Sequence, residues 1–251
     1  MLKRLIVAVI ALFAIAIQAD AAVFSYGNFT GTNYMYLNVI EDTRTQPTAL
    51  FGTPSILGDT LDFDPVSFFA SVSSTTGTAS SEIVDGQLNF AVMSVSDSTP
   101  ISVVRFSESG DYTLAGLGTA QATASVAAPV RWTITHVDGA PLAMPVSGAD
   151  SLTFTPSGNF SLPGDLGTGA LWDGELNVDV AGFAADNGIT GNVTKVEFML
   201  DNTLSVAAAD GGSAAIFKKD FSGVIINVPE PGSLALLVVG LIGFATRRRR
   251  R

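Results

Sequence analysis

The segment KVEFMLD, residues 195–201, alternates between polar and apolar side chains over most of its length. Successive side chains of a strand point to opposite faces, so Val196, Phe198 and Leu200 share one face of an extended chain. The segment ELNVDV, residues 175–180, repeats this alternation. Shorter runs with the same spacing occur at Leu88, Phe90 and Val92, at Val104 and Phe106, and at Leu152 and Phe154. Each run predicts a β-strand with one buried face.

Residue pairs typical of tight turns separate these runs. Asp-Gly and Asn-Gly supply the positive φ angles that short hairpin turns require. The pairs are Asp85-Gly86, Asp138-Gly139, Asp173-Gly174, Asn187-Gly188 and Asp210-Gly211. Residues 224–228 predict a final strand, and no segment between the two termini has a sustained helical spacing of apolar residues. Runs of small residues at 71–81 and 119–128 fit either strands or solvated loops.

These patterns predict an all-β fold, an antiparallel β-sandwich or related jelly roll, over residues 22–227. The usual sizes of β domains favour one sandwich of about ten strands over two smaller ones. If there are two, the segment APLAMP at residues 140–145 is the best candidate for the boundary. The β body is expected to lie between an N-terminal signal helix and a short C-terminal transmembrane helix.

The charge of the chain is divided between its ends and its middle. The 251 residues carry a net charge of −10 and contain no cysteine. Residues 23–228 hold 21 acidic and six basic residues, a net charge of −15, whereas both termini are basic. The lack of cysteine excludes disulfides and thiolate chemistry. The acidic middle argues against a nucleic-acid partner, because binding a phosphate backbone needs clustered lysine and arginine.

The N-terminus has the features of a secretory signal peptide. Residues 1–4 are positively charged, residues 5–17 form an unbroken apolar run, and Ala19 and Ala21 place small residues where a signal peptidase inspects the chain. We therefore predict a signal peptide that is cleaved after Ala21, so that the mature chain begins at Ala22. As a helix the apolar run would span about 20 Å, short of a hydrocarbon core of about 30 Å. An uncleaved anchor is the alternative.

The C-terminus combines three elements over residues 228–251. Pro229-Glu230-Pro231 cannot extend a helix or a sheet, because proline fixes φ and lacks an N–H group. The uncharged run at 233–246 would form a transmembrane helix of only about 21 Å. Five arginines close the chain and hold that end in the cytoplasm by the positive-inside rule. These are Arg247, Arg248, Arg249, Arg250 and Arg251.

This tail resembles the PEP-CTERM sorting signal of exported proteins in Gram-negative bacteria that make exopolysaccharides. The resemblance covers about the last 24 residues and implies recognition by an exosortase, a cysteine-dependent enzyme of the inner membrane. It implies that Pro229, Glu230 and Pro231 are recognition residues, that the helix is a transient anchor, and that the arginines stop transfer. The same tail has been labelled an ice-binding protein C-terminal domain, which we interpret as an address and not as an ice-contacting surface. An ordinary single-pass anchor with a linker is the competing interpretation.

Residues that could support chemistry are sparse in the middle of the chain. His136 is the only histidine, so zinc sites of histidine and cysteine are excluded, and no Gly-x-Ser-x-Gly motif supplies a nucleophile. No cofactor is expected. Asp59, Asp62 and Asp64 offer oxygen ligands for Ca²⁺, but they lack the glycine and the terminal glutamate of an EF-hand loop. A solvated acidic loop is the favoured interpretation of this cluster.

Two functions remain open. The first is a non-enzymatic surface or extracellular-matrix protein, processed by signal peptidase and exosortase and anchored only transiently in the inner membrane. The second is a carbohydrate-binding protein, or a carbohydrate-active one that uses paired carboxylates, with extracellular polysaccharide as partner. Tyr34 and Tyr36 would share a strand face and could stack on sugars, although core packing is the more common use of such rings. The ligand of the mature domain is not encoded in any motif.

Overall fold

The structure is a computed structural model that describes residues 21–219 and 224–227. These residues form two antiparallel sheets, each with eight strands in the described part of the chain. The first sheet, sheet A, contains β1 (Ala22–Thr30), β2 (Tyr34–Thr43), β6 (Ala79–Ser94), β14 (Val193–Ala209), β8 (Gln121–Ala127), β12 (Asn159–Ser161), β9 (Pro129–Val137) and β10 (Ala140–Ser151). The second sheet, sheet B, contains β11 (Thr153–Thr155), β13 (Gly167–Asp179), β7 (Val103–Ala115), β16 (Val224–Asn227), β4 (Thr60–Phe63), β3 (Ser55–Leu57), β15 (Ser213–Lys218) and β5 (Phe69–Ser73).

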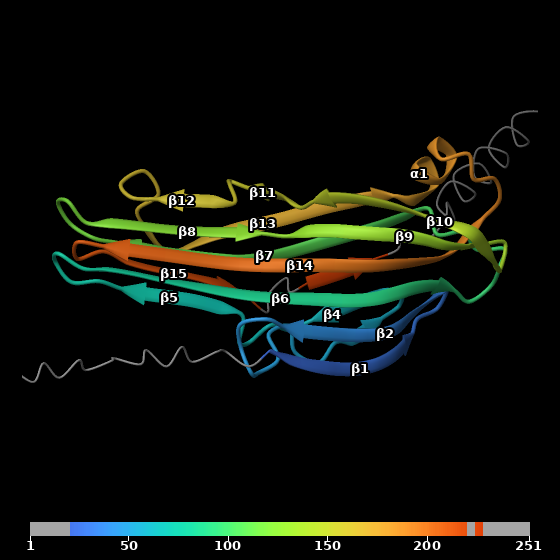
Figure 1. Cartoon of the computed structure of the whole chain (residues 1–251), viewed down its shortest axis with the longest axis horizontal. Coiled ribbons are helices and arrows are strands. Elements are labelled where there is room, and N and C mark those ends of the chain that lie inside the picture. The colour runs from blue at the N-terminus through green and yellow to red at the C-terminus, as the bar shows by residue number, and fades with distance from the viewer. Residues whose placement is uncertain (1–20, 220–223, 228–251) are drawn as a thin grey trace, which may run out of the picture.

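The two sheets enclose one hydrophobic core, and their long strands run along the longest axis of the molecule (Figure 1). Along β14 the even-numbered residues from Val196 to Ala208 are buried, while the odd-numbered ones are more exposed. Phe106 of sheet B packs on Phe90 and Phe198 of sheet A, with ring centres 6.4 and 5.4 Å apart. The period-two pattern of the sequence therefore identified the buried face correctly, and the antiparallel all-β prediction is confirmed.

Two of the five predicted hairpin turns occur as expected. Asp138-Gly139 joins β9 to β10 and Asp210-Gly211 joins β14 to β15, with positive φ at both residues of each pair. Asn187-Gly188 instead ends the helix α1 (Val180–Asp186). This helix was not predicted, and the expected strand at 175–180 ends one residue earlier because Asp179 caps the helix by accepting a hydrogen bond from Gly182 N at 2.8 Å.

The prediction of turns at Asp85-Gly86 and Asp173-Gly174 is wrong, because both pairs lie inside long strands, β6 and β13. The glycines are needed there for space. A Cβ atom at Gly86 would lie 2.8 Å from Leu50 Cδ1, and a Cβ atom at Gly174 would lie 2.6 Å from Phe154 Cε1. Both glycines thus allow apolar side chains to lie directly on the strand backbone.

The remaining expectations have mixed outcomes. Within the small-residue runs, residues 121–127 form β8, while residues 74–78 form the turn between β5 and β6. The candidate boundary at 140–145 lies in β10, whose partner β9 pairs with β14, the strand that also pairs with β8. Both halves of the body thus share sheet A.

In the described ranges, no helix is both long enough and apolar enough to cross a membrane. The predicted signal helix and C-terminal helix lie outside the described residues.

Candidate functional site

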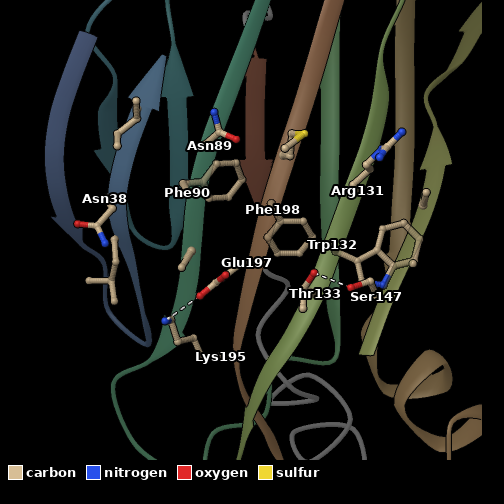
Figure 2. Close-up of a pocket in the computed structure, with 16 residues that line it drawn as sticks. Asn38, Asn89, Phe90, Arg131, Trp132, Thr133, Ser147, Lys195, Glu197 and Phe198 are labelled. Atoms are coloured by element: carbon tan, nitrogen blue, oxygen red, sulfur yellow. Dashed lines mark hydrogen bonds and ion pairs between the residues drawn. The ribbon is translucent and has the colours of Figure 1, made fainter. Parts of the chain in front are cut away.

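A shallow groove of about 770 Å³ crosses the outer face of sheet A, the face turned away from the core. It runs over β2, β6, β14, β9 and β10 (Figure 2). Strand register places its outward side chains in two rows across the sheet. The rows are Ile40, Asn89, Met199, Arg131 and Ala149, and then Leu37, Ala91, Glu197, Thr133 and Ser147. The register of five strands therefore fixes the shape of this surface.

Polar side chains of the groove are arranged in pairs. Lys195 Nζ donates to Glu197 Oε1 at 3.1 Å on β14, and the hydroxyl groups of Thr133 and Ser147 lie 2.8 Å apart across β9 and β10 (Figure 2). Arg131 is exposed at the β9 side. The groove thus offers hydrogen-bond donors and acceptors in fixed positions on a rigid sheet.

The aromatic residues of the groove face the core. Phe90, Trp132 and Phe198 are 4%, 9% and 3% exposed. The rings of Phe90 and Phe198 stack on each other at 5.5 Å, and Trp132 packs edge to face on Phe183 of α1 at 5.5 Å. No ring among the groove-lining residues opens a face to solvent, so a ligand here would be held by hydrogen bonds and not by stacking.

A pair of carboxyl groups lies beside the groove, on β6 and β14. Arg44 Nη1 lies 3.3 Å from Asp201 Oδ2 and 3.7 Å from Asp85 Oδ2. Burial, and then the charge and hydrogen bond of Asp201, raise the pKa of the Asp85 carboxyl. Arg44 is therefore the cation that both carboxyl groups face.

The hypothesis that Tyr34 and Tyr36 form a sugar-stacking platform is wrong. Both side chains are fully buried on the inner face of β2. Tyr34 Oη donates to the carbonyl of Pro100 at 3.0 Å, and Tyr36 Oη donates to the carbonyl of Asp59 at 2.5 Å. Their strand phase placed them on one face as predicted, and that face packs in the core, which is the more common use of such rings.

The Ca²⁺ candidate at Asp59, Asp62 and Asp64 is also not supported by the geometry. Asp59 is buried and accepts hydrogen bonds from Asn33 N at 2.7 Å and Asn33 Nδ2 at 2.8 Å, so it organises the turn before β2. Asp62 lies within β4. Within residues 21–219 and 224–227, no three acidic, histidine or cysteine side chains come together in a way that could hold a metal ion.

His136, the other candidate for chemistry, lies near the end of β9. Its Nδ1 atom is 3.0 Å from Oγ1 of the adjacent Thr135. Trp132 and Ile134 share its strand face and both are buried, whereas His136 is only half-buried. His136 is therefore a residue of a strand end.

Comparison with known proteins identifies the C-terminal segment. The family model of the PEP-CTERM protein-sorting motif matches residues 227–250. The chain carries a PEP-CTERM sorting motif. The match includes Pro229, Glu230 and Pro231, and it includes all of the terminal arginines except Arg251. The motif implies export, a membrane-anchored sorting signal and processing as an exosortase substrate.

The PEP-CTERM motif begins where the last strand of the body ends. β16 pairs with β4 and with the central strand β7 of sheet B, and its last residue, Asn227, is the first residue of the match. The prolines and the rest of the tail lie outside the described residues. The sorting signal therefore follows directly on a strand that is paired on both sides.

No curated protein sequence matches the chain. Solved structures that resemble it at low level include the enzymatically active domain of tailspike protein 4 of bacteriophage CBA120, with 10% identity over 66% of this chain and 20% of that one, and a TM-score of 0.20. TmCBM61 in complex with β-1,4-galactotriose has 10% identity over 64% and 89%, with a TM-score of 0.21. A mutant of Xyn11A from Neocallimastix patriciarum has 9% identity over 79% and 100%, with a TM-score of 0.19. These scores are too low to carry an argument about fold or function.

A second polar cluster, which the sequence patterns did not predict, lies in the core between the sheets. It consists of Glu108 on β7, Asn202 on β14 and Lys218 on β15. Each of these residues occupies a position where the alternation of its strand calls for an apolar side chain. A polar residue in the buried phase of a strand was therefore the signal that could have revealed the cluster.

Proposed function

We propose that the protein is an exported, non-enzymatic surface or extracellular-matrix protein of a Gram-negative exopolysaccharide producer. The observation that carries this proposal is the PEP-CTERM motif at residues 227–250. A signal peptide over residues 1–21, cleaved between Ala21 and Ala22, would start export. The short C-terminal helix would then hold the protein in the inner membrane until exosortase cuts near Pro229-Glu230-Pro231. The body of residues 22–227 would be delivered to the cell surface or its matrix.

The composition of the body supports a role among extracellular polymers. Its net charge of −15 over residues 23–228 keeps it soluble and lets divalent cations bridge it to anionic surfaces. Its long strands form two sheets that pack face to face, which gives a stiff and elongated module (Figure 1). A stiff, soluble and highly charged module suits a structural component of a hydrated matrix.

Fractionation of the producing cells tests this proposal. We expect the body in the extracellular polymer fraction, and a variant chain that lacks residues 228–251 should be exported but not delivered there. The tail would explain this difference, because both chains keep the same signal peptide and body. Recovery of both chains in the same fraction would contradict the proposal.

The groove on sheet A favours one second candidate, a carbohydrate-binding protein. Asn89, Arg131 and Glu197 present hydrogen-bonding groups in adjacent rows, which suits sugar hydroxyl groups. If this function holds, polysaccharide extracted from the producing cells binds the protein, and Arg131→Ala weakens binding at least about tenfold, equivalent to about 1.4 kcal/mol. Arg105→Ala, at an exposed position of β7 on sheet B, is the matched control. Equal binding by both variants would remove the groove from consideration.

A further inference from the structure

Three polar side chains from three strands meet in the middle of the core. Glu108 and Lys218 belong to sheet B and Asn202 to sheet A, so the cluster bridges the space between the sheets. The side chains of Glu108 and Lys218 are 1% exposed, and Asn202 is fully buried. Lys218 Nζ donates to Glu108 Oε2, and Asn202 Nδ2 donates to the same oxygen at 3.0 Å. An amine and a carboxamide are therefore held together by a single carboxylate oxygen.

The surroundings of the cluster are apolar and aromatic. Lys218 Nζ lies 5.2 Å from the ring centre of Phe68 and 5.9 Å from that of Phe51. Strand register places Gly110 beside Lys218 on one side and beside the buried Trp172 on the other. Burial lowers the pKa of the Lys218 ammonium to about 8. The site therefore excludes water and makes the neutral, nucleophilic amine accessible near neutral pH.

Two atoms of the cluster lack hydrogen-bond partners in the described part of the chain. They are Glu108 Oε1 and Asn202 Oδ1, both fully buried. A buried polar atom without a partner is costly and rare in folded proteins. Here one atom is the second oxygen of the Glu108 carboxylate, and the other is the carbonyl oxygen of the Asn202 carboxamide. An ion pair that served stability alone would leave these two atoms at an energetic cost. A reaction between the groups would give the two atoms a use.

We propose that Lys218 and Asn202 react to form an isopeptide bond that joins sheet B to sheet A, with Glu108 as the catalytic proton carrier. The amine, the carboxamide and the acid are the three groups that this amide exchange needs, and the fold holds the first two against one oxygen of the acid. The bond would provide a covalent cross-link in a chain that has no cysteine for a disulfide.

The reaction balances without an external reagent. Lys218 Nζ first passes a proton to the Glu108 carboxylate, which leaves a neutral amine and a neutral acid. The amine lone pair forms a bond to Cγ of Asn202, and the acid protonates Oδ1 as the carbonyl π electrons move onto it. Glu108 then transfers a proton from Nζ to Nδ2, and the Cγ–Nδ2 bond breaks. Ammonia leaves as the carbonyl re-forms and Oδ1 returns its proton to Glu108. One C–N bond is made and one is broken, with no change of oxidation state.

A single digest of the wild-type chain tests the proposal. Asp210 lies between the two residues, so a protease that cleaves before aspartate separates peptide 201–209 from peptide 210–219. In the denatured digest of the full chain, we expect one species with the combined mass of both peptides less one ammonia, about 17 Da. A succinimide at Asn202 would lose the same mass but leave the peptides separate. Two separate peptides would overturn the proposal.

Matched variants assign the roles. Lys218→Met should give separate peptides, whereas Lys219→Met, at the neighbouring exposed lysine that contacts Asp111, should leave them joined. Glu108→Gln keeps the size of the side chain but cannot carry the proton, so Lys218 and Asn202 should stay unlinked. Joined peptides in Glu108→Gln would overturn the role of Glu108. Because the wild-type digest needs no variant to fold, it decides the existence of the bond by itself.

Discussion

Replacing Pro229 and Pro231 together by alanine is expected to leave the C-terminal tail attached and to hold the protein at the inner membrane. The sequence predicts an extended segment here, because proline fixes φ and cannot join a helix or a sheet. With alanine, the helix that the sequence predicts at 233–246 would extend toward β16 and withdraw the cleavage segment from the enzyme. The amount of released protein should fall at least about tenfold. Mass spectrometry of the tail peptides in the membrane and extracellular fractions measures this amount.

A proline outside the motif provides the matched control for this experiment. Pro145 is exposed on β10, and Pro145→Ala should leave processing and release unchanged. Normal release of the double variant would show that the Pro-Glu-Pro segment is not needed for sorting. Loss of release in both variants would point to a folding defect in place of a sorting defect.

The largest effect on stability is expected for Gly110→Ala, at the centre of sheet B. A Cβ atom at this position would lie 1.9 Å from the carbonyl oxygen of Phe217 and 2.5 Å from the ring of Trp172. Trp172 is fully buried, and Phe217 O belongs to the neighbouring strand, so neither can move without disturbing the pairing of β7. We expect the free energy of unfolding to fall by about 3 kcal/mol or more, measured by urea denaturation.

Gly164→Ala is the control for this substitution, because the nearest atom to its added Cβ is Ser161 O at 3.8 Å. It should change the free energy of unfolding by less than about 0.5 kcal/mol. The digest that tests the isopeptide bond should be run on both variants, because Gly110 is the register partner of Lys218 as well as of Trp172. Equal urea midpoints for the two variants would contradict the packing described for β7, β13 and β15.

The fold could be predicted to the extent that it depends on local patterns. The alternation at 195–201 reports burial of one strand face, and the turn at Asp210-Gly211 reports a local backbone conformation. The turn predicted at Asp85-Gly86 does not form. Gly86 instead leaves space for Leu50 and Phe51, which are distant in sequence. The helix α1 was missed because a seven-residue helix capped by one aspartate gives too short a period to recognise.

The sites divide in the same way. The sorting motif at 227–250 is a linear signal, so the sequence alone was enough to recognise it. The cluster of Glu108, Asn202 and Lys218 depends on three strands from both sheets, and no spacing along the chain predicts that they meet. Asp59 shows the reverse case: close spacing in sequence suggested a metal site, but backbone hydrogen bonding uses the carboxylate instead.

The central claim is that the protein is exported and loses both its signal peptide and its C-terminal sorting signal. The mass of the protein recovered from the extracellular polymer of the producing cells tests this claim most directly. The full chain has a mass of 26.0 kDa, and the account predicts a polypeptide of about 21 kDa. Its first peptide should begin at Ala22, and its last should end near Pro229-Glu230-Pro231. A recovered chain of 26.0 kDa that still ends in Arg251 would contradict the account.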